Sequence, residues 1–307
     1  MKVLNPKLSI IISVYGQTNK LRRCLSCVKL TLNNLINYEI LLIDDASEDE
    51  TTNYIKSLES THRVYFNKQR KGFAKNNNFL AREAKGEYLC LLNSDAFVQG
   101  NWLFPMLNVF ETAGDVGFVG NVQKLADSVF YDHMGIVFGP RGNPRHFGQG
   151  FIFKSFSGQT RQWSAVTAAC ALVKKEIFLS FNGFDEAFVN GCEDVELCIR
   201  MSRSGYRHLV AHDSEIQHVK GASVGRKKHN LRNFEILISK CGQSIRSNES
   251  VKDQKLYAKT YIYQALIRPH KANLLKFLES ILIFAGIKKI SLKNNRIKPS
   301  VANPHSN

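Results

Sequence analysis

The first hundred residues alternate between short apolar segments and segments with helical spacing, and this pattern constrains the fold more than any other feature. Strands are predicted where apolar residues run continuously, at Leu8–Val14, Tyr38–Ile43, Arg63–Phe66 and Glu87–Leu92. Helices are predicted between them, at Lys20–Leu35, Glu50–Leu58 and Lys75–Ala84. Because such alternation is typical of a parallel sheet with right-handed crossovers, the sequence predicts an α/β fold.

Beyond residue 100 the pattern is less regular. Strands are expected at Val116–Gly120 and Ala168–Val173, and a helix at Glu193–Arg203, ended by Gly205. Residues 131–162 are rich in Gly, Phe and Arg and predict hairpins or a flexible loop. After residue 225 the chain is expected to be helical, with an apolar stretch at 274–284 and a disordered end.

Three acidic clusters stand where apolar stretches give way to polar residues. They are Asp44-Asp45, Asn93-Ser94-Asp95 and Glu193-Asp194. The first two follow strands directly, and open α/β sheets bind their ligands at the carboxyl ends of the strands. Carboxylates gathered there suit a hard cation and a phosphorylated substrate, with one carboxylate left over as a base. The pattern favours an enzyme that uses a nucleotide-activated donor.

Each cluster also has a purely structural interpretation. Ser47 or Asp49 would serve as the N-cap of the helix that starts near Glu50. An Asn-x-Asp sequence is common in turns, and acidic residues in a first helical turn interact favourably with the helix dipole. The residues themselves leave these alternatives open.

Net charge is concentrated in one part of the chain. Residues 219–307 hold 18 Lys and Arg against 4 Asp and Glu, whereas residues 1–218 hold 24 against 22. A basic region of this kind favours an anionic surface, and it has few aromatic residues interleaved with its charges and no recognisable nucleic-acid-binding module. We therefore expect contact with membrane lipids or a helical cap on the preceding region, and no nucleic acid.

The cysteines and the hydropathy suggest a location. The seven cysteines are scattered, several lie in apolar runs, and no second pair accompanies Cys24-x-x-Cys27 at zinc-site spacing. This pattern favours free thiols in a reducing cytoplasm. No signal peptide or stretch of about 18 apolar residues is evident, so any membrane contact is expected to be peripheral, at the inner face of the cell membrane.

The motifs in their order resemble the family 2 inverting glycosyltransferases of GT-A fold. The resemblance covers roughly residues 8–220 and rests on several short motifs, none of them decisive alone. In chain order they are Ile12-Ser13-Val14-Tyr15, Asp44-Asp45-Ala46-Ser47, Gly72-Phe73-Ala74 with Asn77-Asn78, Gly86-Glu87-Tyr88, Asn93-Ser94-Asp95, Gly183-Phe184-Asp185-Glu186 and Glu193-Asp194 continuing to Arg200. The resemblance implies a Rossmann-like, mixed but mainly parallel sheet, with a catalytic domain at 1–224 and a basic helical extension at 225–307.

The resemblance also implies a role for individual residues. Asp194 matches the catalytic base, with Glu193 as its neighbour. Asp95 matches the last position of a D-x-D motif that binds Mn²⁺ or Mg²⁺ on the donor diphosphate, and His218 resembles a later histidine near that metal. The residues expected to contact the nucleotide-sugar donor are Val14, Tyr15, Asp44, Asp45, Asn78 and Asn93.

The sequence departs from the family pattern at two points. Asn93 replaces the first carboxylate of the D-x-D motif, which leaves one carboxylate for the metal. No Gln-x-x-Arg-Trp follows residue 194, which favours single addition of a sugar over processive synthesis. Two other classes stay open: a nucleotidyltransferase, although no basic Gly-rich loop follows the first strand, and an inactive protein that binds nucleotide sugars.

The acceptor is expected to be a glycan or a lipid-linked glycan in the synthesis of cell-surface polysaccharide or glycolipid. Residues 131–162 are the region where acceptor contacts are predicted. The candidate side chains there and just beyond are Arg141, Arg145, His146 and Trp163.

Overall fold

The computed structural model describes residues 6–140, 142–219, 229–247 and 251–288. One mixed sheet of ten strands dominates it, and its central path runs β10-β12-β6-β11-β4-β1-β2-β3. The first half of the chain supplies β1 (Leu8–Val14), α1 (Thr18–Leu32), β2 (Tyr38–Asp44), α2 (Thr51–Lys56), β3 (Arg63–Phe66), α3 (Phe73–Glu83), β4 (Tyr88–Leu92), β5 (Ala96–Val98), α4 (Phe104–Thr112) and β6 (Val116–Leu125). The α/β prediction is confirmed.

The second half adds the rest of the sheet and the C-terminal helices. Its elements are β7 (Tyr131–His133), β8 (Ile136–Phe138), β9 (Pro144–His146), β10 (Thr160–Trp163), β11 (Cys170–Lys174), α5 (Lys175–Ser180), α6 (Glu193–Ser202), β12 (Arg207–His218), α7 (Asn230–Ser247), α8 (Val251–Ile267), a short 3₁₀ helix (Pro269–Lys271) and α9 (Leu274–Phe284). The hairpin β8–β9 forms a separate two-stranded sheet, so the expectation of hairpins in 131–162 is confirmed.

The order of the strands creates a ligand-binding crevice. β1 lies between β2 and β4 and pairs with both in parallel, while β3 continues the sheet beyond β2. The chain therefore reverses its direction of travel across the sheet beside β1, which is the position where open α/β sheets bind ligands. β11 pairs antiparallel with β4, so the amino end of β11 reaches this same edge.

Two hydrophobic cores cover the two faces of the sheet. Along β1, Leu8, Ile10 and Ile12 face one core, whereas Ile11 faces the other, as the alternation of side chains along a strand requires. Helices α1, α2 and α4 cover the first face, and α3, α5 and α6 cover the second. Because both faces of the sheet are covered, the central strands have apolar residues at nearly every position.

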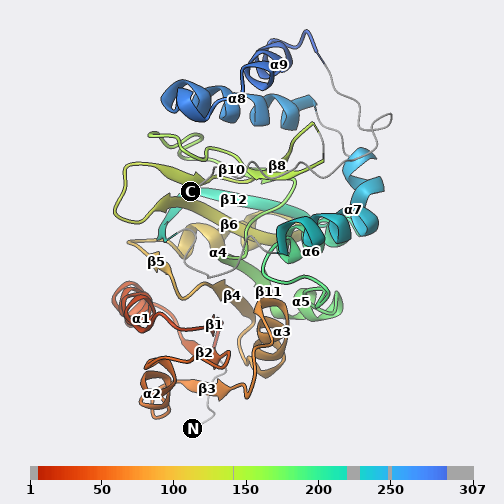
Figure 1. Cartoon of the computed structure of the whole chain (residues 1–307). Helices are drawn as coiled ribbons and strands as arrows, with labels where there is room; N and C mark the ends of the chain where they lie inside the picture. The colour runs from red at the N-terminus through yellow and green to blue at the C-terminus, as the bar shows by residue number, and fades with distance from the viewer. Residues whose placement is uncertain (1–5, 141, 220–228, 248–250, 289–307) are drawn as a thin grey trace.

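Of the C-terminal helices, α7 and α8 pack on the sheet-containing body, and α9 packs on α8 (Figure 1). Leu237, Cys241 and Ile245 of α7 belong to the second core, and α8 packs on β8. The expected cap is therefore present for α7 and α8. The predicted division between residues 224 and 225 lies outside the described residues. No described helix combines the length and the apolar character needed to span a membrane.

Candidate functional site

A cavity of about 310 Å³ opens at the carboxyl edge of the parallel strands. Its floor and walls come from segments far apart in the sequence, because three strand ends, the start of β11 and the start of α6 meet there. The lining residues are Ser13, Tyr15, Gln17, Asp45, Arg70, Phe73, Asn93, Ser94, Asp95, Asp132, Ile136, Pro144, His146, Thr167, Ala168, Ala169, Asn190, Gly191, Cys192, Glu193, Asp194, Val195, His218 and Asn230.

Asp95 and His218 form a pair in the wall of the cavity. β12 pairs with β5, and this register places His218 opposite Ala96, next to Asp95. The Nε2 atom of His218 lies 3.2 Å from Oδ1 of Asp95, and both side chains are largely buried. Imidazole nitrogen and carboxylate oxygen both bind divalent cations such as Mn²⁺. The pair therefore fits the predicted metal site.

The protein would supply only part of a metal's coordination shell. Within the described ranges, no three His, Cys, Asp or Glu side chains are grouped closely enough to hold an ion. Mg²⁺ is usually held by one or two carboxylates of the protein together with substrate phosphates and water. Asn93, which also lines the cavity, stands where the D-x-D motif has a carboxylate. This replacement agrees with a metal site in which the protein supplies only some of the ligands.

The two carboxylates after β2 have different surroundings. Asp45 lines the cavity, and its carboxylate accepts hydrogen bonds from the backbone N–H groups of Lys71 (2.7 Å) and Gly72 (3.0 Å). Asp44 instead accepts hydrogen bonds from Ser47 and Thr52, which hold the loop after the strand. Asp45 thus forms part of the cavity wall, and Asp44 shapes the loop behind it.

Glu193 and Asp194 open α6 and both line the cavity. Asp194 is the more exposed of the two, and its Oδ2 accepts a hydrogen bond from the backbone N–H of Ala168 at 3.1 Å. Glu193 is 6% exposed, and its Oε2 accepts from the backbone N–H of Gly191 at 2.6 Å. Asp194 is consequently the carboxylate better placed to take a proton from a bound hydroxyl group.

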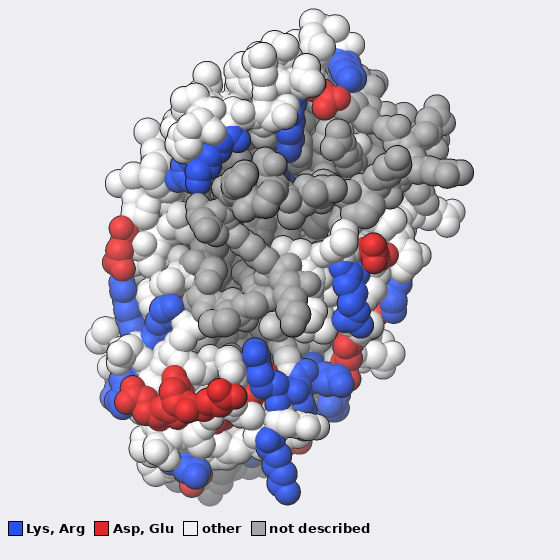
Figure 2. Space-filling model, viewed as in Figure 1, with Lys and Arg blue, Asp and Glu red and all other residues white. Residues whose placement is uncertain are grey.

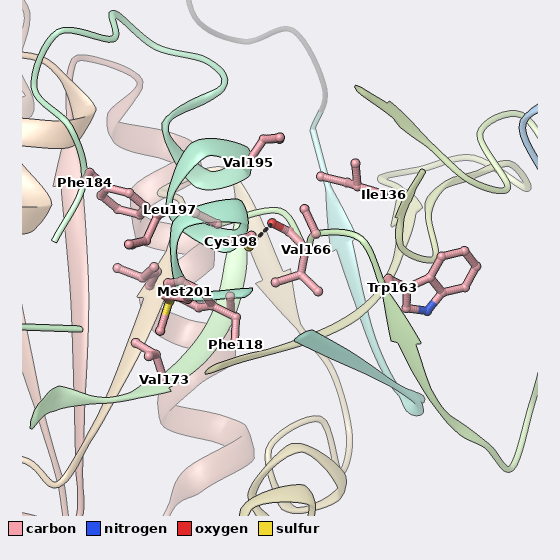
Figure 3. Close-up of a cluster of buried hydrophobic side chains, with 14 of the residues drawn as sticks. Phe118, Ile136, Trp163, Val166, Val173, Phe184, Val195, Leu197, Cys198 and Met201 are labelled. Carbon is pink, nitrogen blue, oxygen red and sulfur yellow. Dashed lines mark hydrogen bonds between the residues drawn. The ribbon is translucent and has the colours of Figure 1, made fainter. Parts of the chain in front are cut away.

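Helix α6 is fixed by the core beneath it. Figure 3 shows Val195, Leu197, Cys198 and Met201 of this helix among the buried side chains, with the thiol of Cys198 directed at the carbonyl oxygen of Val166. These buried residues recur at helical spacing, so they lie on one side of α6 and fix the helix against the core. The amino end of the helix, with Glu193 and Asp194, lies at the cavity. The core therefore determines where Asp194 lies.

Three residues predicted to contact the donor do not reach the cavity with their side chains. Val14 is fully buried in the sheet, and Asp44 holds its own loop. Asn78 lies on α3, where its amide donates to the carbonyl of Phe184 and accepts from the N–H of the same residue, both at 2.8 Å. Its task in the structure is to join α3 to the turn before α6.

The structure also places residues at the cavity that sequence reasoning missed. The guanidinium of Arg70 lies 3.6 Å from the centre of the Tyr15 ring, and both residues line the cavity. Asn190 accepts a hydrogen bond from the backbone N–H of Phe73, so two loops meet there. The sequence feature that could have pointed to Arg70 is the run of basic residues before Gly72.

The segment expected to bind an acceptor contributes a different set of residues. His146 lines the cavity, together with Asp132. Trp163 is buried in the second core, and Arg145 donates to Gln264 of α8 at 2.5 Å. Arg141 lies outside the described residues.

All seven cysteines are free thiols in the structure, as predicted. Burial raises the pKa of the Cys24 and Cys198 thiols well above the usual value, so neither forms a thiolate near neutral pH. Cys192 differs from the other cysteines in its position, because it lines the cavity beside Glu193.

Comparison with known proteins agrees with this geometry. The model of the family described as Glycosyl transferase family 2 matches residues 9–180. The sequence is 29% identical over 227 residues to the O-antigen biosynthesis protein RfbC of Myxococcus xanthus. That alignment covers 71% of this chain and 18% of the relative, so the chain spans less than a fifth of the relative's length.

Two solved structures share the fold. The first is a crystal structure of GalNAc-T7 with UDP, GalNAc and Mn²⁺, with a TM-score of 0.63 and 17% identity over 94% of this chain and 56% of the other. The second is the mannosyltransferase PcManGT from Pyrobaculum calidifontis in complex with GDP-Man and Mn²⁺, with a TM-score of 0.56 and 17% identity over 92% and 75%.

Proposed function

The chain belongs to glycosyl transferase family 2, and on that premise we propose that it transfers one sugar from a nucleoside-diphosphate sugar to an acceptor hydroxyl group, with inversion at the anomeric carbon. The observation that carries this proposal is the meeting of Asp45, Asp95 and Asp194, from three separate parts of the chain, around one cavity. The name of the Myxococcus relative supports a role in the synthesis of a cell-surface polysaccharide or glycolipid.

The donor would lie along the edge formed by the ends of β1, β2 and β4. Asp45 would bind the base or the ribose, and Tyr15 with Arg70 forms the neighbouring wall of the cavity. Arg70 brings a positive charge to a cavity otherwise lined by several carboxylates. A guanidinium there would favour the anionic diphosphate.

Asp95 and His218 would hold a divalent cation, either Mn²⁺ or Mg²⁺. The Mn²⁺ in both structural neighbours supports this assignment. When bound, the ion supplies neutralisation of the negative charge that grows on the departing nucleoside diphosphate.

Asp194 would act as the base. It removes the proton from the acceptor hydroxyl while the hydroxyl oxygen attacks the anomeric carbon and the bond to the nucleoside diphosphate breaks. The attack comes from the face opposite the leaving group, so a single displacement inverts the anomeric configuration. The bond from Ala168 N–H holds the carboxylate in place for this step.

The proposal is tested by measuring donor binding and turnover separately. We expect one nucleotide sugar from a panel to raise the melting temperature with Mn²⁺ and not with EDTA, and we expect Asp95→Asn to abolish the difference. Asp194→Asn should keep donor affinity while lowering turnover by roughly 10²–10⁴-fold. Asp127→Asn, an exposed carboxylate paired with Arg23, is the matched control.

Two outcomes would contradict the proposal. Near-normal turnover in Asp194→Asn would remove the base assignment. Donor binding without any turnover in the unchanged protein would favour the inactive nucleotide-sugar-binding alternative.

The exposed face of α9 supports a further proposal, peripheral contact with an anionic membrane at the inner face of the cell membrane. Exposed apolar side chains recur there at helical spacing, and their exposed fractions are Leu274 69%, Leu275 78%, Leu278 49%, Ile281 41% and Leu282 40%. Between residues 266 and 288 four basic residues face a single acidic one, Glu279, which pairs with Lys288. An apolar stripe with basic neighbours is typical of helices that lie in the lipid interface.

A further inference from the structure

A second cavity, of about 550 Å³, has no part in the mechanism above. It lies where the end of β3, the loop after that strand and one face of α3 meet. The lining residues are Ile43, Tyr65, Phe66, Asn67, Gln69, Arg70, Lys71, Lys75, Asn76, Phe79, Arg82 and Glu186. Arg70 also lines the cavity described above, so the two cavities are neighbours.

Positive charge dominates this second cavity, which is called the basic cavity below. Its basic residues are Arg70, Lys71, Lys75 and Arg82, and its acidic residue is Glu186. The ion pairs in the described part of the chain involve other Lys and Arg residues. Figure 2 shows Lys and Arg gathered where Figure 1 places α3. Because like charges repel one another, an anion bound among them would lower the electrostatic energy.

Helix α3 contributes both charge and aromatic surface. Lys75, Phe79 and Arg82 are four and three residues apart, so they lie on one face of the helix. The two basic side chains are exposed, whereas the Phe79 ring is partly buried and packs edge-on against Tyr65, with ring centres 4.9 Å apart. The hydroxyl group of Tyr65 donates to Glu83 at 3.1 Å, which holds the ring in place. The cavity therefore combines a fixed aromatic wall with cationic groups at its rim.

The loop after β3 separates the two cavities. The carboxylate of Asp45, which lines the first cavity, accepts hydrogen bonds from the backbone N–H groups of Lys71 and Gly72 and from Nδ2 of Asn67 at 3.0 Å. Asn67 also donates to Asn76 of α3 at 2.8 Å. The carboxylates that suit a divalent cation line the first cavity and not the second. An anion in the basic cavity would consequently need no metal ion.

We propose that the basic cavity is a second anion site, separate from the donor site, and that it binds a phosphate ester. A phosphate monoester carries a charge between about −1.5 and −2 at neutral pH and offers three acceptor oxygens, which suits guanidinium and ammonium groups. The ring of Phe66, 39% exposed, offers apolar surface to the carbon part of the ester. A soluble phosphate ester and a lipid-linked one share this chemistry.

The test titrates inorganic pyrophosphate into the full chain by calorimetry in the presence of EDTA. We expect binding without metal, and Lys75→Ala/Arg82→Ala should weaken it roughly ten- to a hundredfold, because two charged contacts are lost. Asp95→Asn, which changes the donor site, should leave the Kd in EDTA unchanged. Arg22→Ala/Lys29→Ala removes the same charge from exposed positions of α1 and should also leave it unchanged.

Three results would overturn the anion site. They are no binding in EDTA, an equal loss of affinity in the α1 variant, and binding that needs Mn²⁺ and disappears in Asp95→Asn. Glucose 6-phosphate and farnesyl monophosphate, which carry the same phosphate group, then distinguish the soluble source from the lipid-linked one. The ester that binds more tightly, and binds more weakly to Lys75→Ala/Arg82→Ala, identifies the source. If neither ester binds, the assignment to a phosphate ester is wrong.

Discussion

The backbone before Asp194 is held in an uncommon conformation. Asn190, Gly191 and Cys192 have φ values of 52°, 149° and 70°, three successive residues in the region that favours glycine. A non-glycine residue in such a conformation costs about 1–3 kcal/mol and persists only where its surroundings enforce it. Here the result is that the chain turns sharply enough to present both Glu193 and Asp194 to the cavity.

A buried histidine makes the stability of the fold depend on pH. Nδ1 of His208 accepts from the N–H of Phe118, and its Nε2 contacts the carbonyl oxygen of Cys198, so the ring is neutral. Burial lowers the pKa of His208 to about 4 from the ordinary 6.5. Since the unfolded chain binds a proton at a higher pH, the free energy of unfolding should fall as the pH drops from about 6.5 to 4, by at most ~3 kcal/mol from this residue.

Urea unfolding at pH 7, 5.5 and 4.5 measures this effect. The variant His208→Gln should be less stable at pH 7 but should show a smaller loss on acidification. The exposed His270→Gln is the control and should leave the pH dependence unchanged. An equal pH dependence in His208→Gln would show that other groups dominate.

At the scale of elements, α6 is tied to the preceding turn by one arginine. Arg200 forms a two-point ion pair with the buried Glu196, with both distances at 2.9 Å, and also donates to the carbonyls of Phe181 and Gly183. Arg200→Met would leave Glu196 buried without its partner, which costs about 3–5 kcal/mol. We expect that loss in the free energy of unfolding.

The double variant Glu196→Gln/Arg200→Met is the matched comparison. It removes the uncompensated charge, so it should recover a large part of the lost stability in the same urea titration. If the single and double variants are equally unstable, the carbonyl contacts and not the ion pair hold the turn.

The elements that the sequence predicted best are those in which the apolar residues follow a single clear pattern. β1 and β3 have the predicted bounds, because their apolar runs end at polar residues on both sides. β12 was not predicted, since its buried side chains include His208, His212 and Ser214, which interrupt the apolar pattern. Helix α4 was also missed, since Phe104–Phe110 are apolar at nearly every position and show no clear helical period.

The positions of Asp45 and Asp95 at the cavity could be predicted, because each residue comes shortly after the end of a strand. Asp132 and Arg70 could not be assigned in that way, because their approach to the cavity depends on how loops and a hairpin fold over the sheet. The same limit explains Asn78, whose amide is occupied by a turn more than a hundred residues further along the chain.

At the scale of the whole molecule, the exposed apolar side chains of α9 lie in a segment whose described charged residues are mainly basic. In Figure 2 the surface at the top, where Figure 1 places α8 and α9, is mostly uncharged with scattered Lys and Arg. Lys and Arg near an anionic surface contribute about 1 kcal/mol each, and buried apolar side chains add to this. The basic residues therefore predict selectivity for anionic lipids, and the apolar residues add affinity for a bilayer of either kind.

Vesicle co-flotation tests this contact with the full chain. We expect binding to vesicles that contain phosphatidylglycerol, weaker binding to pure phosphatidylcholine, and release at high salt. Leu275→Glu/Leu282→Glu should reduce binding without loss of nucleotide affinity, whereas Asn53→Glu, at an exposed position of α2 at the other end of the molecule, should not reduce it. Equal binding of all proteins to both kinds of vesicle would contradict the proposal.

The position of β12 has a consequence for synthesis of the chain. This strand comes late in the sequence, yet it lies between β6 and β10 and brings His218 to Asp95. Until residues 207–218 have left the ribosome, β6 lacks its parallel partner, and an unpaired strand edge is prone to association with other chains. A nascent chain arrested before that point would therefore lack a complete site and would depend on chaperones to stay monomeric.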